Sequence, residues 1–282
     1  MLPHFLIIGT KKGGTTSLHR YLSFHPQLFL PALKELMFFN SKNWHRGREW
    51  YERFFVDDGR TCGEATPDYT WFPREKDVPA RIHALIPHCK LVYIIRDPVE
   101  RMLSNHSERV GSLHECREFS EIIDTPEYEI YFEAGRYFAQ IQQYLAFFPA
   151  RSIHVMTLEN LAENPQREIR QLCAFLGVEP DAIPSSRLEE RLNTTPDKRR
   201  RNAVGRLLYS PRMQQRLNGK LPWRVHLTIE RIATWRGETI RKPVLSDAHR
   251  ERLAGRFRDD FRRLQDFTGM AFSNWKNIEY LR

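Results

Sequence analysis

The segment 11–17, Lys-Lys-Gly-Gly-Thr-Thr-Ser, concentrates side chains that could bind an anion. It follows a short apolar run at 5–8 that is typical of a buried strand, and helical spacing of apolar residues follows it up to residue 22. Gly13 and Gly14 allow positive φ and close backbone approach. Successive N–H groups could therefore form a concave anion nest at a helix N-terminus, where the helix dipole also favours negative charge. The pattern predicts a phosphate-binding loop.

The position of the lysines separates this loop from the nucleoside triphosphate loop G-x-x-x-x-G-K-[ST]. That motif would place lysine directly after Gly14, but the next residue is Thr15, and Lys11 and Lys12 stand ahead of the glycines. We therefore expect a phosphate loop that is not an ordinary ATP or GTP loop. For this segment alone, the alternative is a glycine-rich strand-to-helix turn without a ligand.

A second candidate phosphate contact follows the continuous apolar run KLVYII at 90–95. The run is typical of a central parallel strand, and Asp97-Pro98 then turns the chain into a helix. Ligands bind at this edge of open α/β sheets. Arg96 offers a planar fork for bidentate phosphate contact, and the Ser104 hydroxyl follows about two helical turns later. The alternative is an ordinary capped junction with surface arginines.

Two residues are candidates for a general base. Glu35 stands beside Lys34 and ahead of an aromatic pair, and a single acidic residue in such a place is more often a solvated charge. His106 has the side chain that serves most often as a general base. On a helix that begins near position 98, however, His106 and Ser104 are two residues apart and face different ways. We therefore favour Glu35 over His106.

Four stretches resemble motifs of the sulfotransferases that use 3′-phosphoadenosine 5′-phosphosulfate (PAPS). They are K-G-G-T from Lys12, K-E-x-x-F-F from Lys34, E-A-T-P-x-Y from Glu64 and R-D-P-x-x-R-x-x-S from Arg96. The motifs are most similar to those of the heparan-sulfate-type branch, and the chain resembles a soluble bacterial-type member of the family. The similarity continues to about Val178.

The resemblance implies that PAPS is the sulfuryl donor and that adenosine 3′,5′-bisphosphate (PAP) is the product. It assigns the 5′-phosphosulfate to the loop residues Lys12, Gly13, Gly14, Thr15, Thr16 and Ser17, and the 3′-phosphate to Arg96 and Ser104. Glu35 would take the acceptor's proton during in-line attack on sulfur, while Lys12 offsets the charge on the leaving oxygen. No metal ion is expected.

Three departures from the heparan-sulfate-type pattern leave the acceptor open. Ala65 stands where that branch often has lysine, and Met37 and Asn40 stand where it places a histidine and an aspartate near the sugar. The candidates are a carbohydrate, a lipid-linked sugar and a hydroxylated natural product, attacked through a hydroxyl or an amine.

Composition favours a globular chain with an anionic ligand or partner. The 282 residues carry a formal net charge of +9 with 41% hydrophobic residues, and no apolar run approaches the length of a membrane span. The first apolar segment lacks a charged n-region and a cleavage site, so we expect no signal peptide and a cytoplasmic location. The four cysteines lie far apart, which predicts neither a zinc site nor a disulfide framework.

The expected fold is α/β, with a P-loop-like parallel β-sheet flanked by helices in a single domain over residues 1–282. The nucleotide-binding core is expected at 1–180 and a basic, largely helical portion at 187–282. Further strands are predicted at 27–30 and 152–157, and further helices at 81–86, 137–148, 169–176 and after residue 246. The polar stretch 108–133 is expected to be a surface excursion over the active site.

The stretch 187–242 contains 15 Lys or Arg against five Asp or Glu. It could cap the nucleotide phosphates, contact an acidic acceptor or form a solvated charged face. Sulfotransferases close over the nucleotide with a basic C-terminal loop, and the clusters at 198–201 and 241–242 are both candidates for it. Neither is a clean copy.

Two other functions fit parts of the sequence. A P-loop small-molecule kinase could share the first strand, loop and helix, but it would need the lysine that position 15 lacks and an acidic magnesium ligand. A nucleic-acid or acidic-polymer binding protein could use the basic stretch, with affinity that falls steeply with salt. Neither function accounts for both phosphate motifs. We therefore expect a carbohydrate or small-molecule acceptor and no nucleic acid, and the sequence does not indicate an oligomeric state.

Overall fold

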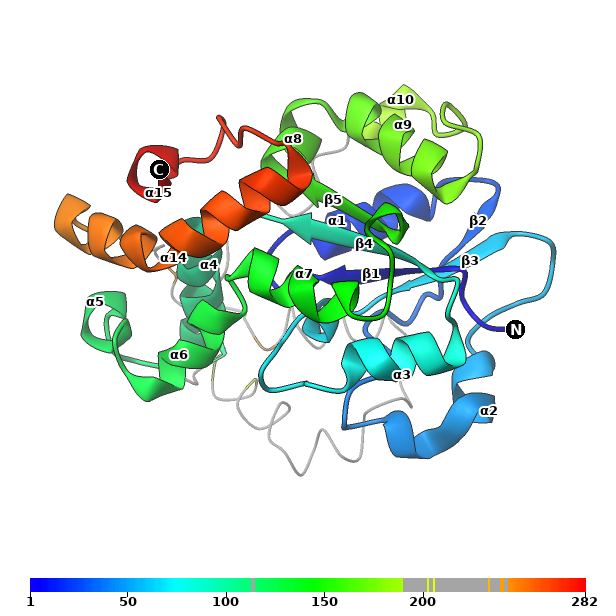
Figure 1. Cartoon of the computed structure of the whole chain (residues 1–282), viewed down its shortest axis with the longest axis horizontal. Helices are drawn as coiled ribbons and strands as arrows, with labels where there is room; N and C mark the ends of the chain where they lie inside the picture. The colour runs from blue at the N-terminus through cyan, green and yellow to red at the C-terminus, as the bar shows by residue number, and fades with distance from the viewer. Residues whose placement is uncertain (113–114, 190–201, 203–204, 206–232, 234–238, 241–242) are drawn as a thin grey trace.

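The structure is a computed structural model of the chain, and it describes residues 1–112, 115–189, 202, 205, 233, 239–240 and 243–282. Five strands form one parallel sheet in the order β2-β3-β1-β4-β5 (Figure 1). The strands are β1 (Phe5–Gly9), β2 (Leu28–Phe29), β3 (Thr61–Ala65), β4 (Lys90–Ile95) and β5 (Ile153–Thr157). The expected parallel sheet flanked by helices is confirmed.

The central strands are buried on both faces, which is why they appear as continuous apolar runs in the sequence. In β1, Leu6 and Ile8 pack into one core layer, and Phe5 and Ile7 pack into the other. Helices α1 (Thr15–Leu22) and α9 (Pro165–Leu176) cover one face of the sheet. Helices α3 (Val78–Leu85), α7 (Tyr137–Leu145) and α14 (Asp247–Thr268) cover the other face (Figure 1).

The remaining elements complete the described part of the chain. They are the 3₁₀ helices η1 (Trp44–Arg46), η2 (Pro67–Tyr69) and η3 (Ala150–Ser152), and the α-helices α2 (Gly47–Glu52), α4 (Pro98–Gly111), α5 (Phe119–Ile122), α6 (Pro126–Glu133), α8 (Leu158–Glu163), α10 (Ser185–Leu188) and α15 (Ile278–Leu281). None of the helices in the described ranges has both the length and the apolar character needed to cross a bilayer.

The expected surface excursion at 108–133 is wrong. Helix α4 continues to its end at Gly111, and α5 and α6 follow it with Phe119, Ile122, Tyr128 and Phe132 buried. Pro126 does not interrupt a helix but begins α6, because the missing N–H of proline costs no hydrogen bond at the first position. This part of the chain is therefore a packed helical layer beside α4.

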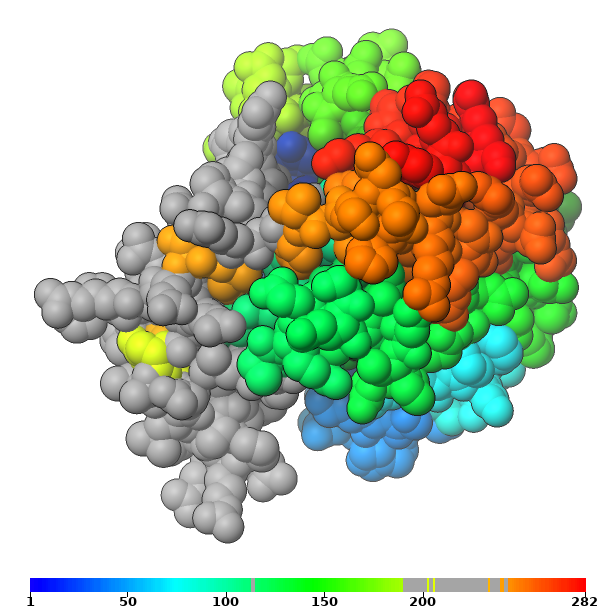
Figure 2. All heavy atoms as spheres, turned by 90° about the vertical axis from the view of Figure 1, so that its left-hand side faces the viewer, coloured from blue at the N-terminus to red at the C-terminus, as the bar shows by residue number. Residues whose placement is uncertain are grey.

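The C-terminal helix is confirmed after Ser246, whose side chain accepts a hydrogen bond from the His249 N–H. Gly269 ends it with a φ of 67°, and α15 follows. Figure 2 shows α14 and α15 (orange to red) on the same side of the molecule as α5 and α6 (green). The basic clusters at 198–201 and 241–242 lie outside the described residues, and the boundary near residue 180 stays a prediction.

Candidate active site

The predicted phosphate loop connects the carboxyl end of β1 to the start of α1, and close packing shapes it. The Thr10 N–H donates to the Ile94 carbonyl at 2.6 Å, and the Gly13 N–H donates to the Thr10 carbonyl at 2.9 Å. A Cβ atom on Gly13 would lie 2.7 Å from the Ile94 oxygen. Gly14 has a φ of 101°, and a Cβ atom there would lie 2.7 Å from Leu158 Cδ1. Both glycines are therefore required by the backbone path.

The loop presents donors and positive charge where α1 begins. The first turn of α1 contains no acidic residue, and the first N–H groups of a helix have no partner within it. Lys12 has a φ of 68°, so the backbone alternates in hand through the loop, as anion nests do. The Thr10 hydroxyl is buried without a hydrogen-bond partner among the described residues. These features fit the binding of an anion.

Lys12 is held at the loop by a residue from α4. Its Nζ lies 3.2 Å from Glu108 Oε1, and the Lys12 side chain is only 15% exposed. Lys11 points toward the ring of Trp71, with its Nζ 5.6 Å from the ring centroid. An anion in the loop would therefore compete with Glu108 for the Lys12 ammonium.

Lys34 connects the loop to the candidate base. Its Nζ donates to Thr15 Oγ1 at 3.1 Å, to Thr16 Oγ1 at 3.1 Å and to Glu35 Oε1 at 2.9 Å. One ammonium thus joins the first turn of α1 to a carboxylate 20 residues further along the chain. Sequence reasoning assigned no role to Lys34, and its only signal was its place directly before Glu35.

Glu35 lies in an irregular segment beside β3. Its N–H donates to the Ala65 carbonyl at 3.0 Å, and its side chain is 40% exposed. Its φ is 64°, and that of Met37 is 50°, which is uncommon for residues other than glycine and frequent at functional sites. The structure thus places the candidate base at the edge of the phosphate loop and open to solvent.

Asp68 is a second carboxylate on this side of the loop, and sequence reasoning missed it. Burial raises the pKa of Asp68, and the charges of Glu35 and Glu108 raise it further, while Lys11 and Arg74 lower it. Asp68 therefore lies close enough to Lys11 of the loop and to the candidate base Glu35 for their charges to act on it. Its position inside the E-A-T-P-x-Y stretch was the signal available.

The second predicted phosphate contact lies where β4 meets α4. The Arg96 guanidinium is 3.7 Å from Glu100 Oε2, and the Arg96 carbonyl accepts from the Tyr137 hydroxyl at 2.6 Å. Ser104 is partly buried on α4. Glu100 and Ser104 are four residues apart on α4, and Arg96 reaches Glu100 from just before the helix begins.

Asp97 of the R-D-P stretch is a structural anchor. Its Oδ1 accepts from the N–H groups of Val99 and Glu100, each at 3.0 Å, and so caps α4. Its Oδ2 accepts from the backbone N and from Nδ2 of Asn277, at 2.7 and 2.9 Å. The C-terminal segment is thereby attached to the Arg96 junction, which no motif in the sequence indicated.

Glu159 lies behind the same junction. Its Oε1 accepts from the Asp97 N–H at 3.1 Å. Burial raises the pKa of Glu159 to about 7, the charge of Asp97 raises it too, and the positive charge of Arg96 opposes the rise. A carboxyl group with variable charge therefore lies close to the predicted 3′-phosphate contact.

His106, the rival base, is buried among aromatic side chains. It is 3% exposed, its Nδ1 lies 2.7 Å from the Tyr128 hydroxyl, and its ring packs edge-on against Phe119. Burial lowers the pKa of His106. Glu35, in contrast, shares the Lys34 ammonium with the loop.

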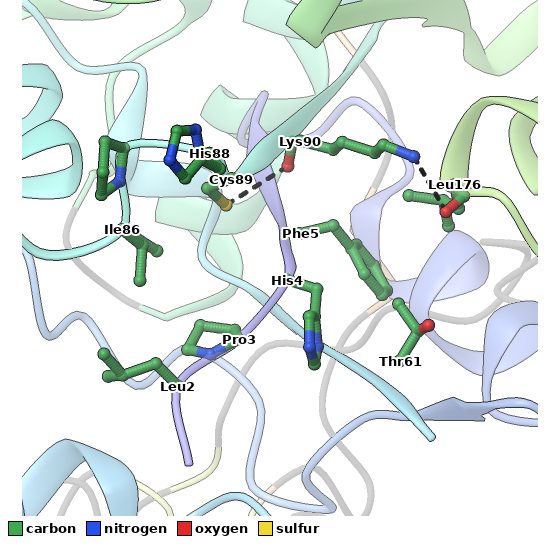
Figure 3. Close-up of a pocket in the computed structure, with 11 residues that line it drawn as sticks. Leu2, Pro3, His4, Phe5, Thr61, Ile86, His88, Cys89, Lys90 and Leu176 are labelled. Carbon is green, nitrogen blue, oxygen red and sulfur yellow. Dashed lines mark hydrogen bonds between the residues drawn. The ribbon is translucent and has the colours of Figure 1, made fainter. Parts of the chain in front are cut away.

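A cavity of 440 Å³ lies at the opposite, amino end of the strands (Figure 3). Leu2, His4, Ile86, Cys89 and Leu176 are among its lining residues. The Lys90 ammonium, the charged group of this region, donates to the Leu176 carbonyl at 3.0 Å. The cavity shares no residue with the candidate active site.

The residues that the structure describes also contain no group of three His, Cys, Asp or Glu side chains arranged for a metal ion.

Comparison with known proteins supplies a family match. The family described as "Sulfotransferase domain" matches residues 2–233. The bifunctional heparan sulfate N-deacetylase/N-sulfotransferase of Drosophila melanogaster is 30% identical over 208 residues, covering 64% of this chain and 20% of the relative. The mouse heparan sulfate glucosamine 3-O-sulfotransferase 3A1 is 31% identical over 188 residues, covering 63% of this chain and 46% of the relative. The chain therefore spans less than half the length of these two relatives.

A solved structure extends the likeness over nearly the whole chain. The sulfotransferase from Alicyclobacillus acidocaldarius is 25% identical and superposes with a TM-score of 0.69, covering 98% of this chain and 99% of that one.

Proposed function

This chain belongs to the sulfotransferase domain family, and we propose that it transfers a sulfuryl group from PAPS to a hydroxyl or amine of a carbohydrate or small-molecule acceptor. One observation carries the proposal. The Lys34 ammonium contacts both threonines of the phosphate loop and the Glu35 carboxylate within 3.1 Å. The Lys34 side chain thus connects the candidate base to the proposed anion-binding start of α1. Direct transfer from donor to acceptor requires the base and the donor site to lie this close together.

The loop and the Arg96 junction suit the two ends of the donor. Lys12 and the N–H groups at the start of α1 would hold the 5′-phosphosulfate, together with the hydroxyls of Thr15, Thr16 and Ser17. Arg96 and Ser104 would hold the 3′-phosphate through a planar fork and a hydroxyl. The chemistry that PAPS supplies is an activated sulfuryl group.

Glu35 would act as the general base. As the acceptor oxygen or nitrogen attacks sulfur, its proton passes to the Glu35 carboxylate, and the bond from sulfur to the bridging phosphate oxygen breaks. Lys12 would offset the negative charge on that oxygen, which leaves as part of PAP. The partial exposure of Glu35 leaves it open to an acceptor that approaches from solvent.

The acceptor side combines an aromatic ring with charged groups. Trp71 has the Arg74 guanidinium 4.6 Å from its ring centroid and Lys11 on the same ring, and Asp68 lies near both cations. A flat ring with cations and carboxylates suits a polar, ring-shaped acceptor such as a sugar. The curated relatives are named for heparan sulfate, which makes carbohydrate the first class to test. A cytoplasmic location stays a prediction.

Calorimetric binding of PAP, beside ADP and ATP with magnesium, tests the donor site. We expect wild-type protein to prefer PAP and Arg96→Ala to lose that preference. Arg48→Ala is the matched control, because Arg48 is exposed and pairs with Glu52 on α2, so it should bind PAP normally. Equal or tighter binding of ATP would contradict the proposal and favour a kinase.

Transfer of radiolabelled sulfate from PAPS to a panel of acceptors tests the reaction. The panel contains N-desulfated heparan sulfate, a neutral oligosaccharide and a phenol. We expect Glu35→Gln to lower kcat by about a hundredfold or more while PAP binding is kept. A folded, PAP-binding Glu35→Gln protein with near-normal turnover would overturn the assignment of the base.

A further inference from the structure

We propose that Glu64 is a positioning residue that holds the segment 35–39, and with it the Glu35 carboxylate, in the geometry that the transfer needs. The proposal rests on the proposed function, because it takes Glu35 as the base. Glu64 lies in β3 and is 2% exposed, so it cannot itself meet an acceptor. Its effect must pass through the groups that it contacts.

The Glu64 carboxylate is surrounded by hydroxyl donors. Its Oε1 accepts from the Tyr51 hydroxyl at 2.8 Å and from the Tyr69 hydroxyl. Its Oε2 accepts from Thr66 Oγ1 at 3.1 Å. Burial raises the pKa of Glu64 to about 7, and above that pH its carboxylate can only accept, so the single proton of each hydroxyl points toward it.

Because these protons point to Glu64, two of the hydroxyl oxygens can accept hydrogen bonds from the segment 35–39. Thr66 Oγ1 accepts from the Met37 N–H at 3.2 Å, and the Tyr69 hydroxyl oxygen accepts from the Phe38 N–H at 3.1 Å. Each oxygen keeps lone pairs for these N–H groups because its proton points to Glu64. Glu64 therefore sets the direction of hydrogen bonds that end on the backbone of the Glu35 segment.

The segment needs such support because its backbone is strained. Glu35 and Met37 have φ values of 64° and 50°, and a left-handed conformation costs roughly 1 kcal/mol or more for a residue with a Cβ atom. The Glu35 N–H is held by the Ala65 carbonyl, the Leu36 backbone N–H interacts with the Glu64 carboxylate itself, and the next two N–H groups donate to Thr66 and Tyr69. Loss of these bonds would let the backbone relax and move the Glu35 carboxylate away from Lys34.

The two tyrosines provide a matched pair of variants. Both are fully buried and both donate to Glu64 Oε1, but only Tyr69 also accepts an N–H from the segment. Thr66 provides a second pair, because Thr66→Ser keeps the hydroxyl while Thr66→Val replaces it with a methyl group of similar size. Network variants that act only on core stability would affect both members of the tyrosine pair alike.

The first test is amide hydrogen exchange of the full chain, which needs no acceptor. Glu64→Gln, Tyr69→Phe and Thr66→Val should each increase exchange at the Met37 and Phe38 amides by about tenfold or more. Tyr51→Phe and Thr66→Ser should leave these two amides within about threefold of wild type. Equal exchange in all five variants would overturn the proposal.

The second test is a double-mutant cycle on kcat, with the acceptor that wild-type protein uses. We expect Glu64→Gln to lower kcat by about tenfold and to leave the Kd for PAP within about twofold, because only the base is displaced. In a Glu35→Gln background, the same change should alter the residual turnover by less than about twofold.

The outcomes separate the two proposals. Glu64→Gln that lowers kcat equally in both backgrounds, or that weakens PAP binding as much as kcat, would show a general structural effect and overturn the positioning role. An inactive Glu35→Gln beside a fully active Glu64→Gln would overturn this inference alone. A fully active Glu35→Gln would overturn the base assignment, and the positioning role with it.

Discussion

The two regions proposed to grip the nucleotide are built in different ways. The loop at 10–17 takes its shape from close packing against Ile94 of β4 and Leu158 of α8, which leaves room only for glycine at positions 13 and 14. The junction at 96–104 depends on distant residues, because Asp97 binds Asn277, which is 180 positions away, and Glu159, which is 62 positions away. Close steric packing therefore shapes one end of the site, and buried hydrogen bonds hold the other.

This difference has a consequence for nucleotide recognition. Asn277 lies beyond residues 2–233, the part that the family matches, yet it bonds the residue next to Arg96. We expect changes in the C-terminal segment to affect recognition of the 3′-phosphate, and changes in the loop to affect binding of both ends of the donor. Four measurements can break or sharpen this contrast.

The largest effect is expected for Gly14→Ala. The new methyl group would meet Leu158 at a backbone φ of 101°, so the loop must move and all nucleotide binding should fall by about a hundredfold. Stability should fall by about 2–3 kcal/mol. Calorimetry with PAP and adenosine 5′-monophosphate, with thermal unfolding, measures both.

Gly59→Ala is the control for that change. Its φ of 84° is also positive, but no atom lies within 4 Å of the new Cβ. It should cost about 1 kcal/mol and leave nucleotide binding unchanged. Equal effects of the two variants would show that backbone conformation, and not packing, makes the loop depend on glycine.

A smaller and more selective effect is expected for Asn277→Ala. Removal of Nδ2 leaves the buried Asp97 Oδ2 with one donor fewer, which loosens the Arg96 junction. The affinity for PAP should fall by about tenfold, and that for adenosine 5′-monophosphate by less than about twofold. Asn274 lies in the same C-terminal segment as Asn277 and donates a hydrogen bond to Asn160. Asn274→Ala loses this bond and should change the affinity for neither nucleotide. Equal losses for the two nucleotides would refute the division of labour.

Glu108→Gln is expected to strengthen binding. It removes the carboxylate 3.2 Å from Lys12, so the phosphosulfate no longer competes for that ammonium. Because Glu108 is 44% exposed, the gain should be only about threefold at low salt and should vanish at high salt. Asp181→Asn, which breaks an exposed pair with Arg170 elsewhere, is the control. Weaker binding by Glu108→Gln would mean that Glu108 orients Lys12 usefully.

The smallest effect concerns pH and Glu159. Burial raises its pKa from 4.5 to about 7, so between these values the folded state binds more protons than the unfolded state, and stability falls as pH rises. The charged groups near it are Arg96 and Asp97, and burial raises the pKa of the Tyr137 hydroxyl beside it, which stays neutral.

Thermal unfolding from about pH 5 to pH 8 measures this dependence. Glu159→Gln should reduce the fall in Tm by ~3 °C. Part of the slope should remain, because burial also raises the pKa of Glu64 to about 7. An unchanged slope would mean that Glu159 does not titrate in this window.

Much of the fold was predictable because its signals are local. The strand at 90–95 has the predicted bounds, and α9 ends before Gly177, whose φ is 82°. The position of the loop was predictable because two glycines between an apolar run and a helical pattern mark a strand-to-helix turn. The helices at 119–122 and 126–133 were missed because a few buried aromatics in a polar stretch give no clear period.

The candidate site was only partly predictable, because only some of its residues belong to motifs that a local pattern reveals. The roles of Glu35 and Arg96 followed from motifs, and they stay predictions until the variants are measured. Lys34, Asp68 and Glu64 carried no signal of their own, since a lysine or a carboxylate in a motif can equally be a surface charge.

The sequence by itself determined the parallel α/β architecture and the placement of the two strand-to-helix turns that are proposed to bind phosphate, because hydrophobic period and glycine conformation act over a few residues. Only the tertiary structure decided that Lys34 joins the loop to Glu35, that Glu64 is buried beneath that segment, and that Asn277 supports the Arg96 junction. A hydrogen bond depends on distance and direction in space, and these become known only when the sheet has brought distant segments together.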